Sequence, residues 1–183
     1  MATESAFVEV AREVAERVLP PPLSVQRGAA LLYQVTVDNQ LSITVDVKRP
    51  TRGSSAYQTD LCVFENKSEA VNIPRVVVEF KTRISTHDVL TYSAKATKHK
   101  QVYPYLRYGI VASAETAVPG RLFTHNESLD FCATVGGLDG KKLEDFFASL
   151  LSAEVESSRQ LEAIAFGSVR TRLFRTEVIL HGI

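Results

Sequence analysis

One segment, residues 75–82, combines the pattern of a buried β-strand with two charges that a buried strand rarely carries. It reads Arg-Val-Val-Val-Glu-Phe-Lys-Thr, and its three consecutive valines favour a central strand that is covered on both faces. Because side chains alternate between the faces of a strand, Glu79 and Lys81 share one face with Val77. A carboxylate and an ammonium on such a strand are expensive to bury unless they are paired or bound to a metal.

The chain has 183 residues, of which 45% are hydrophobic, so we expect a single domain over residues 1–183 with a sizeable core. No run of about 18 apolar residues and no charged-then-apolar leader is present, so we predict neither a membrane span nor export. Cys62 and Cys132 lie in apolar runs, which suits buried free thiols in a reducing compartment and predicts a cytoplasmic protein. The absence of a Cys-x-x-Cys pair excludes a zinc ribbon.

Hydrophobic periodicity and turn residues predict both helices and strands. The predicted helices cover 3–18, 86–103 and 141–164. The predicted strands cover 29–37, 41–48, 57–64, 75–82, 108–113 and 129–135, with a hairpin turn at 38–40, loops at 49–55 and 66–74, and an edge strand over 169–180. This order predicts an α/β domain with a mixed central β-sheet flanked by helices, its core in about residues 1–115 and a strand and helix elaboration in 116–183.

The helix predicted over 86–103 directly follows the charged strand. Thr86 is its expected N-cap, and the stripe expected of an amphipathic helix consists of Leu90, Ala94, Thr97 and Gln101.

Charge is unevenly spread along a chain whose formal net charge at pH 7 is zero. Between Lys81 and Tyr108, six basic residues stand against one acid, which gives this segment a local charge of +5. The basic residues are Lys81, Arg83, Lys95, Lys98, Lys100 and Arg107, and the acid is Asp88. The neutral total argues against a purely electrostatic coat on DNA, but it leaves room for a protein with a local basic face.

The acid Asp60 lies inside the strand predicted just before the one that carries Glu79 and Lys81. With the helix and second apolar strand that follow, this arrangement resembles the PD-(D/E)XK nuclease superfamily, which has the restriction-endonuclease-like fold. The resemblance covers roughly residues 1–115. The string Val-Glu-Phe-Lys-Thr looks most like RecB-type members, whose Gln-x-x-x-Tyr motif is matched by Gln101 and Tyr105.

This sequence departs from the family pattern at two positions. Thr59 stands where many members have proline before the first acid, a position that varies widely. Pro104 lies inside the Gln-x-x-x-Tyr match, and proline disfavours helix in the residue before it. Tyr105 is therefore expected near or beyond the end of the helix, which makes its assignment weaker than that of Gln101.

The resemblance implies roles for individual residues. Asp60 and Glu79 would bind Mg²⁺, with Mn²⁺ as an alternative, and Lys81 would be the catalytic lysine. Gln101 would assist catalysis from the following helix. The resemblance and the basic segment together assign DNA contacts to Lys95, Lys98, Lys100 and Tyr105. Some members carry a further carboxylate on the N-terminal helix, for which Glu13 is the candidate metal ligand and Glu16 the alternative.

The function implied is a Mg²⁺-dependent nuclease that hydrolyses phosphodiester bonds in DNA, as an endonuclease of defence or DNA processing. No helix-turn-helix or zinc finger is evident in the sequence, so either a homodimer or a separate DNA-recognition subunit is the expected partner. The sequence leaves DNA versus RNA open. The alternative is a catalytically inactive member of the fold that binds nucleic acid or protein. An unrelated small-molecule enzyme is disfavoured because no Gly-rich phosphate loop and no nucleophile elbow is present.

The same residues also fit purely structural roles, which the sequence leaves open. The Asp60, Glu79 and Lys81 set also fits an ion pair with a turn-capping Asp. The Gln101 and Tyr105 side chains also fit an exposed helix surface, and the lysine run fits a solvated face. Glu13 also fits ordinary helix pairing with Arg17.

Overall fold

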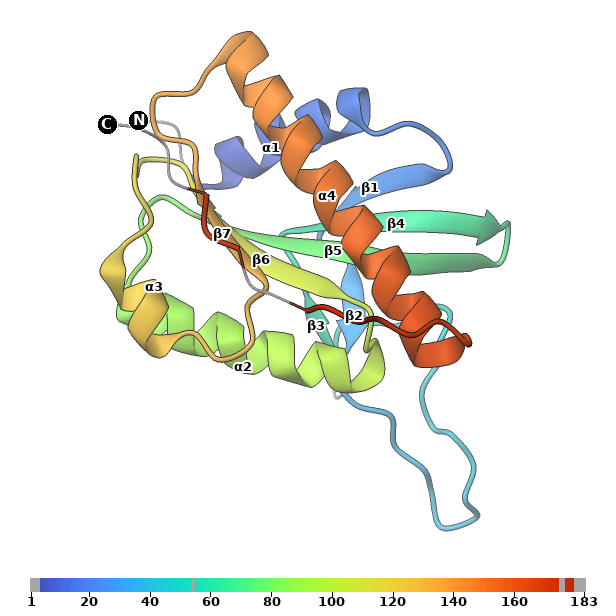
Figure 1. Ribbon diagram of the computed structural model, residues 1–183. Helices are drawn as coiled ribbons and strands as arrows, with labels where there is room; N and C mark the ends of the chain where they lie inside the picture. Colours follow the sequence, from blue (N-terminus) through green and yellow to red (C-terminus); the bar gives the residue numbers. More distant parts are fainter. Residues whose placement is uncertain (1–3, 54, 175–176, 180–183) are drawn as a thin grey trace.

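The computed structural model describes residues 4–53, 55–174 and 177–179 (Figure 1). Its helices are α1 (Glu4–Val18), α2 (Thr86–Val102), α3 (Gly120–His125) and α4 (Gly140–Phe166). Its strands are β1 (Leu23–Arg27), β2 (Ala30–Leu32), β3 (Ala56–Gln58), β4 (Leu61–Ser68), β5 (Val71–Lys81), β6 (Arg107–Ala112) and β7 (Phe131–Thr134).

Five of these strands form one mixed sheet, in the order β1-β4-β5-β6-β7. Strands β1, β4 and β5 are antiparallel neighbours, whereas β6 and β7 continue the sheet in parallel with β5. Helices α1 and α4 cover one face, and α2 and α3 lie on the other (Figure 1). The prediction of an α/β domain with a mixed sheet flanked by helices is confirmed. Strands β2 and β3 pair separately in a small second sheet.

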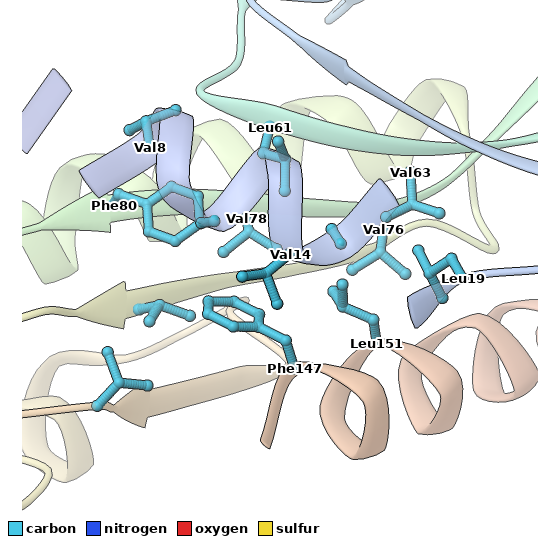
Figure 2. Close-up of a cluster of buried hydrophobic side chains, with 14 of the residues drawn as sticks. Val8, Val14, Leu19, Leu61, Val63, Val76, Val78, Phe80, Phe147 and Leu151 are labelled. Atoms are coloured by element: carbon cyan, nitrogen blue, oxygen red, sulfur yellow. The ribbon is translucent and has the colours of Figure 1, made fainter. Parts of the chain in front are cut away.

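Successive side chains of β5 point to opposite faces of the sheet and therefore belong to two separate core layers. Val76, Val78 and Phe80 are fully buried against α1 and α4, where Phe147 of α4 packs beside them (Figure 2). Val77, on the opposite face, packs in the second core with residues of β6 and α2. The predicted alternation is therefore confirmed, and Glu79 and Lys81 belong to the α2 side of the sheet.

Helix α1 forms where the sequence predicts it, and Figure 2 shows its apolar face. Its buried residues, Val8, Ala11, Val14 and Ala15, recur at helical spacing and pack on the sheet. The helix ends at Val18, just before the three prolines at 20–22, whose rings cannot continue it.

The strands predicted over 29–37 and 41–48 are wrong in extent. Only Ala30–Leu32 forms a strand, and residues 33–53, which we call the arm, project away from the body (Figure 1). The turn itself is present, because the Asp38 carboxylate accepts hydrogen bonds from the backbone N–H groups of Gln40 and Ser42. Beyond one isolated bridge the arm pairs with no strand, and Leu41 at its tip is 83% exposed, since no second layer covers it.

The antiparallel part of the sheet, β1-β4-β5, is a meander. Its first strand, β1, was not predicted from the sequence. This strand follows the prolines directly and pairs antiparallel with β4. It was missed because five residues are too few to show a clear alternation of apolar and polar side chains. The strand predicted over 57–64 is split at Thr59 and Asp60 into β3 and β4.

The loop predicted at 66–74 is also wrong, because β4 runs to Ser68 and β5 begins at Val71. Proline usually interrupts a central strand. Pro74 is tolerated because it lies beside an irregularity in the β4–β5 register and before Val76, where β6 joins the sheet.

Helix α2 is rotated relative to the predicted stripe. Ser85 rather than Thr86 is the N-cap, and it forms a capping box with Asp88. The buried residues are Val89, Ser93, Ala96 and His99, one to two positions before the predicted set. The predicted stripe includes Leu90, which is 48% exposed. The helix is only weakly amphipathic, so its inward face is chosen by the groove that it fills rather than by its own pattern.

The C-terminal third contributes to the same core. Leu143, Phe147 and Leu151 of α4 pack against the α1 side of the sheet. The short helix α3 was not predicted. The edge strand predicted over 169–180 is absent from the described residues 167–174 and 177–179. None of the described helices is both long and apolar enough to cross a membrane.

Candidate functional site

The antiparallel pairing of β4 with β5 brings Asp60 and Glu79 together. Leu61 pairs with Val78, so Asp60, one residue before β4, lies beside the end of β5. The backbone N–H of Phe80 donates to Asp60 Oδ2 at 2.8 Å, and the N–H of Asp60 donates to Glu79 Oε2 at 3.3 Å. These two bonds fix both carboxyl groups at one place on the sheet.

Glu79 lies in a nearly dry environment, with 2% of its surface exposed. The Tyr108 hydroxyl on β6 donates a hydrogen bond to Glu79 Oε1, and Lys95 Nζ on α2 lies 3.7 Å from the same oxygen. Burial, together with the adjacent Asp60, raises the pKa of the Glu79 carboxyl to about 7 against the opposing effects of Lys95 and the Tyr108 hydrogen bond. Glu79 therefore exchanges its proton near neutral pH.

Lys81 is held at the edge of this group by an acid from another element. Its Nζ donates to Glu4 Oε1 at 2.8 Å. Burial disfavours the ammonium, but the interactions with Glu4 and Tyr92 together outweigh this and raise the pKa of Lys81. The Tyr92 ring of α2 lies close to two ammonium groups, with Lys81 Nζ 5.5 Å and Lys95 Nζ 4.9 Å from its centroid.

A cleft of about 570 Å³ opens beside these residues. Asp60, Glu4 and Lys95 line it directly, whereas the buried Glu79 lies behind Asp60. Arg27 and Arg52 add positive charge to its wall. The three residues predicted at the centre of the site, Asp60, Glu79 and Lys81, are thus gathered at or next to one cleft.

Gln101 and Tyr105 are not brought to this cleft. Gln101 is exposed and lines a separate hollow of about 390 Å³ with Lys98. Tyr105 packs near the opposite end of β5, where its ring contacts Phe166 and the guanidinium of Arg75, 5.5 Å from its centroid. The rotation of α2 explains the position of Gln101, because Tyr92 and Lys95 take the side of the helix that faces Glu79.

The three lysines predicted to contact DNA do not share one face. Lys95 reaches Glu79, whereas Lys100 pairs with Asp130 at 2.7 Å on the side of β7. Lys98 stays exposed at the second hollow. Residues 95 and 100 are 140° apart around an ideal helix, so this separation follows from their spacing. Ion pairs therefore neutralise much of the basic segment.

The predicted carboxylate on the N-terminal helix is also placed differently. Glu13 is exposed, and Glu16 pairs with Arg12 along the helix surface. Glu4 instead faces the cleft from the first turn of α1. A signal was present in the sequence, because Glu4 lies four residues before the buried Val8 and therefore on the inward stripe of the helix.

The oxygen atoms gathered here suit a hard divalent cation. Among the described residues no group of three or more His, Cys, Asp or Glu side chains forms an all-protein metal centre. Mg²⁺ needs only one or two carboxylates, with waters and substrate phosphate completing its shell. Asp60 and Glu79 supply such a pair, and each is oriented by a second hydrogen-bond partner, as metal ligands usually are.

No protein-family model matches this chain, and no curated protein matches it. The geometry of the site is therefore what supports a functional proposal.

Proposed function

We propose that this protein is a Mg²⁺-dependent nuclease that hydrolyses phosphodiester bonds in DNA, an endonuclease of defence or DNA processing. One observation carries the proposal: the carboxyl groups of Asp60 and Glu79 meet beside an open cleft, with Lys81 two residues further along the same strand. A structural ion pair with a backbone-capping Asp60 would also place both acids here, but it would not require Asp60 to line an open cleft.

The order of the elements supports the same proposal. Apart from the small β2–β3 sheet inserted between β1 and β4, helix α1 is followed by the antiparallel strands β1, β4 and β5, then by α2 and the parallel strand β6. This is the order expected of the restriction-endonuclease-like fold. Asp60 precedes the second strand of this meander, and Glu79 and Lys81 lie on the third, as that resemblance requires.

Asp60 and Glu79 would hold the cation, which would supply Lewis acidity toward the phosphate and toward a bound water. Asp60 offers its carboxylate to the cleft. Glu79 can give up its proton near neutral pH, so the site can gain negative charge when a cation arrives. The protein thus avoids holding two unpaired carboxylates together in the metal-free state.

Lys81 would act on the phosphate or on the attacking water from the same side of the sheet. Its ammonium is ionised at neutral pH and can stabilise negative charge that develops on the phosphoryl oxygens. Glu4 holds it in place, so Glu4 is a positioning residue for the lysine rather than a group that reaches the reacting atoms.

A plasmid-nicking assay with Mg²⁺ and with EDTA tests the proposal. We expect the wild-type protein to nick supercoiled DNA only with Mg²⁺, and Asp60→Asn to lose this activity while keeping its fold. Glu13→Gln is the matched control, because Glu13 is exposed and away from the cleft. If the wild-type protein binds DNA but never cuts it with Mg²⁺ or Mn²⁺, the proposal is contradicted and an inactive binding subunit becomes the better interpretation.

A further inference from the structure

Of the three lysines on α2 only Lys98 stays exposed, at the second hollow, whereas the arm carries three exposed cations. Lys81, Lys95, Lys100 and Arg107 each pair with an acid. By contrast, Lys48, Arg49 and Arg52 are all exposed. Residues 47–58 of the sequence include these three cations and no acid, which gives that stretch a charge of +3.

This basic stretch leads directly into the proposed active cleft. Arg52 lines the cleft and donates to Gln58 Oε1 at 3.4 Å, while Gln58 Nε2 donates to the backbone carbonyl of Gly28 at 3.3 Å. Gly28 has φ +69°, a conformation that favours glycine, and a Cβ there would lie 2.8 Å from Gln58 Nε2, so a larger residue would displace the Gln58 side chain from this link. The base of the arm is therefore fixed against the cleft wall.

An aromatic pair lies at the same junction. The rings of Tyr33 and Tyr57 stack with their centroids 4.1 Å apart and their planes 19° from parallel. Tyr57 lines the cleft three residues before Asp60 and is 37% exposed. His99 packs against Tyr57 in a T-shaped contact, with the ring centroids 5.8 Å apart and the planes 84° from parallel. The cleft thus presents an oriented and partly exposed aromatic ring near the acids.

We infer that the substrate taken by this cleft is single-stranded or unpaired DNA, with an unpaired base stacked on Tyr57 and the backbone following Lys48, Arg49 and Arg52. A stacking ring combined with a cationic track is the arrangement by which proteins bind single strands without reading sequence. Bases inside a duplex are already stacked on each other and cannot use Tyr57 unless they are extruded. This inference rests on the proposed nuclease function, because it assigns the substrate of the same cleft.

The test uses fluorescence anisotropy with Asp60→Asn protein in EDTA, so that binding is measured without cleavage. The probes are a labelled oligodeoxythymidine of roughly 16 nucleotides, a duplex of the same length, and an abasic strand that keeps the phosphates but lacks bases. We expect the oligodeoxythymidine to bind at least about tenfold more tightly than the abasic strand, and more tightly than the duplex.

A second substitution assigns the stacking to Tyr57. Adding Tyr57→Leu keeps apolar bulk but removes the flat ring, and it should lower affinity for the oligodeoxythymidine by about tenfold while leaving the abasic strand and the duplex nearly unchanged. Tyr57→Phe should bind as tightly as the parent. Equal affinity of the parent for the oligodeoxythymidine and the abasic strand, or a Tyr57→Leu variant with parental affinity and an unchanged fold, overturns the inference.

The arm is tested by the salt dependence of the same binding. Replacing Lys48, Arg49 and Arg52 with alanine should reduce the slope of log affinity against log salt concentration by about 2, at roughly 0.7 for each lost phosphate contact on a single strand. Lys98→Ala is the control, since Lys98 is exposed on the second hollow, and it should leave the slope unchanged. An unchanged slope in the triple variant removes the arm from the substrate path.

Failure of this inference differs visibly from failure of the nuclease proposal. If the wild-type protein nicks DNA with Mg²⁺ but binds the duplex more tightly, and Tyr57→Leu does not change its affinity for single strands, only the substrate assignment is wrong. If the stacking signature is present but no DNA substrate is ever cut, the binding assignment stands and the nuclease proposal is the one that fails.

Discussion

Glu79 is a carboxyl group in a nearly dry site that nevertheless loses its proton near neutral pH. The competition that sets its pKa is local: burial and Asp60 favour the protonated form, whereas Lys95 and the Tyr108 hydroxyl favour the charged form. Because each influence comes from a named neighbour, single substitutions should move the stability and the metal affinity in predictable directions.

The metal-free protein should lose stability as the pH rises toward 8. The folded state raises the pKa of the Glu79 carboxyl from 4.5 to about 7, so it holds this proton more tightly than the unfolded chain does. The stabilisation is therefore complete below about pH 4.5 and is lost as the pH rises through about 7, at most roughly 3 kcal/mol. Urea denaturation in EDTA at several pH values measures it. Glu79→Gln should flatten this dependence, and equal pH profiles in both proteins would contradict the assignment.

A divalent cation should stabilise the folded protein through the same two carboxyl groups. Millimolar Mg²⁺ or Mn²⁺ should raise the melting temperature by mass action, more strongly at pH 8 than at pH 6, because binding displaces the Glu79 proton. Asp60→Asn should reduce the shift, whereas Glu13→Gln should keep it. If neither Mg²⁺ nor Mn²⁺ changes the melting temperature of the wild-type protein, this would count against the site.

The N-cap of α2 fixes where this helix begins. Ser85→Ala should destabilise the protein by about 1 kcal/mol, since it removes the side chain that accepts from the Asp88 backbone N–H. Thr86→Ala is the matched comparison, because the residue next to the cap has no such role and should change stability by less than about 0.5 kcal/mol. Urea denaturation of both variants distinguishes them, and equal losses would contradict the assigned cap.

How far the sequence predicts an element depends on how strong its pattern is. The run of valines in β5 was unambiguous, so the shared face of Glu79 and Lys81 followed correctly, and Asp60 was placed beside them by the strand predicted just before. Helix α2 has no dominant apolar face, so its rotation was set by packing, which left Gln101 away from the site and brought in Lys95.

Long-range packing supplied what local patterns could not. Glu4 reaches Lys81 across 77 positions of sequence, and Tyr108 reaches Glu79 because β6 joins β5 in parallel. The strand prediction for the arm was wrong because four of its alternating apolar residues, Val35, Val37, Ile43 and Val47, are exposed rather than buried. Short elements such as β1 and α3 were missed because they are too short for periodicity to appear.

At the scale of the whole molecule, a buried ion cluster fastens α4 to the sheet. Arg75 is fully buried, and it donates to Glu65 of β4 at 2.8 Å and to Glu162 of α4 at 2.6 Å. Arg159 of α4 completes the cluster by donating to Glu65 at 3.0 Å. The C-terminal helix is therefore tied to the strand that carries the site, at the end of β5 away from Glu79.

Removing the central cation of this cluster should be costly. Arg75→Ala should destabilise the fold by about 3–5 kcal/mol, because it leaves the buried Glu65 carboxylate without its main partner. Arg17→Ala is the control, since the Arg17–Glu144 pair also joins α4 to another element but is exposed, and it should cost less than about 1 kcal/mol. Chemical denaturation compares them, and similar losses would show that the buried cluster contributes no more than a surface pair.

The most direct test of the central claim is to measure cleavage and DNA affinity together on wild-type protein and Lys81→Ala. We expect the wild-type protein to nick supercoiled plasmid with Mg²⁺, and Lys81→Ala to bind the same DNA with nearly unchanged affinity but without nicking it. Affinity rests on the sum of many phosphate contacts, whereas the chemical step depends on this one ammonium. A Lys81→Ala protein that cuts at the wild-type rate, or a folded wild-type protein that never cuts, would contradict the account.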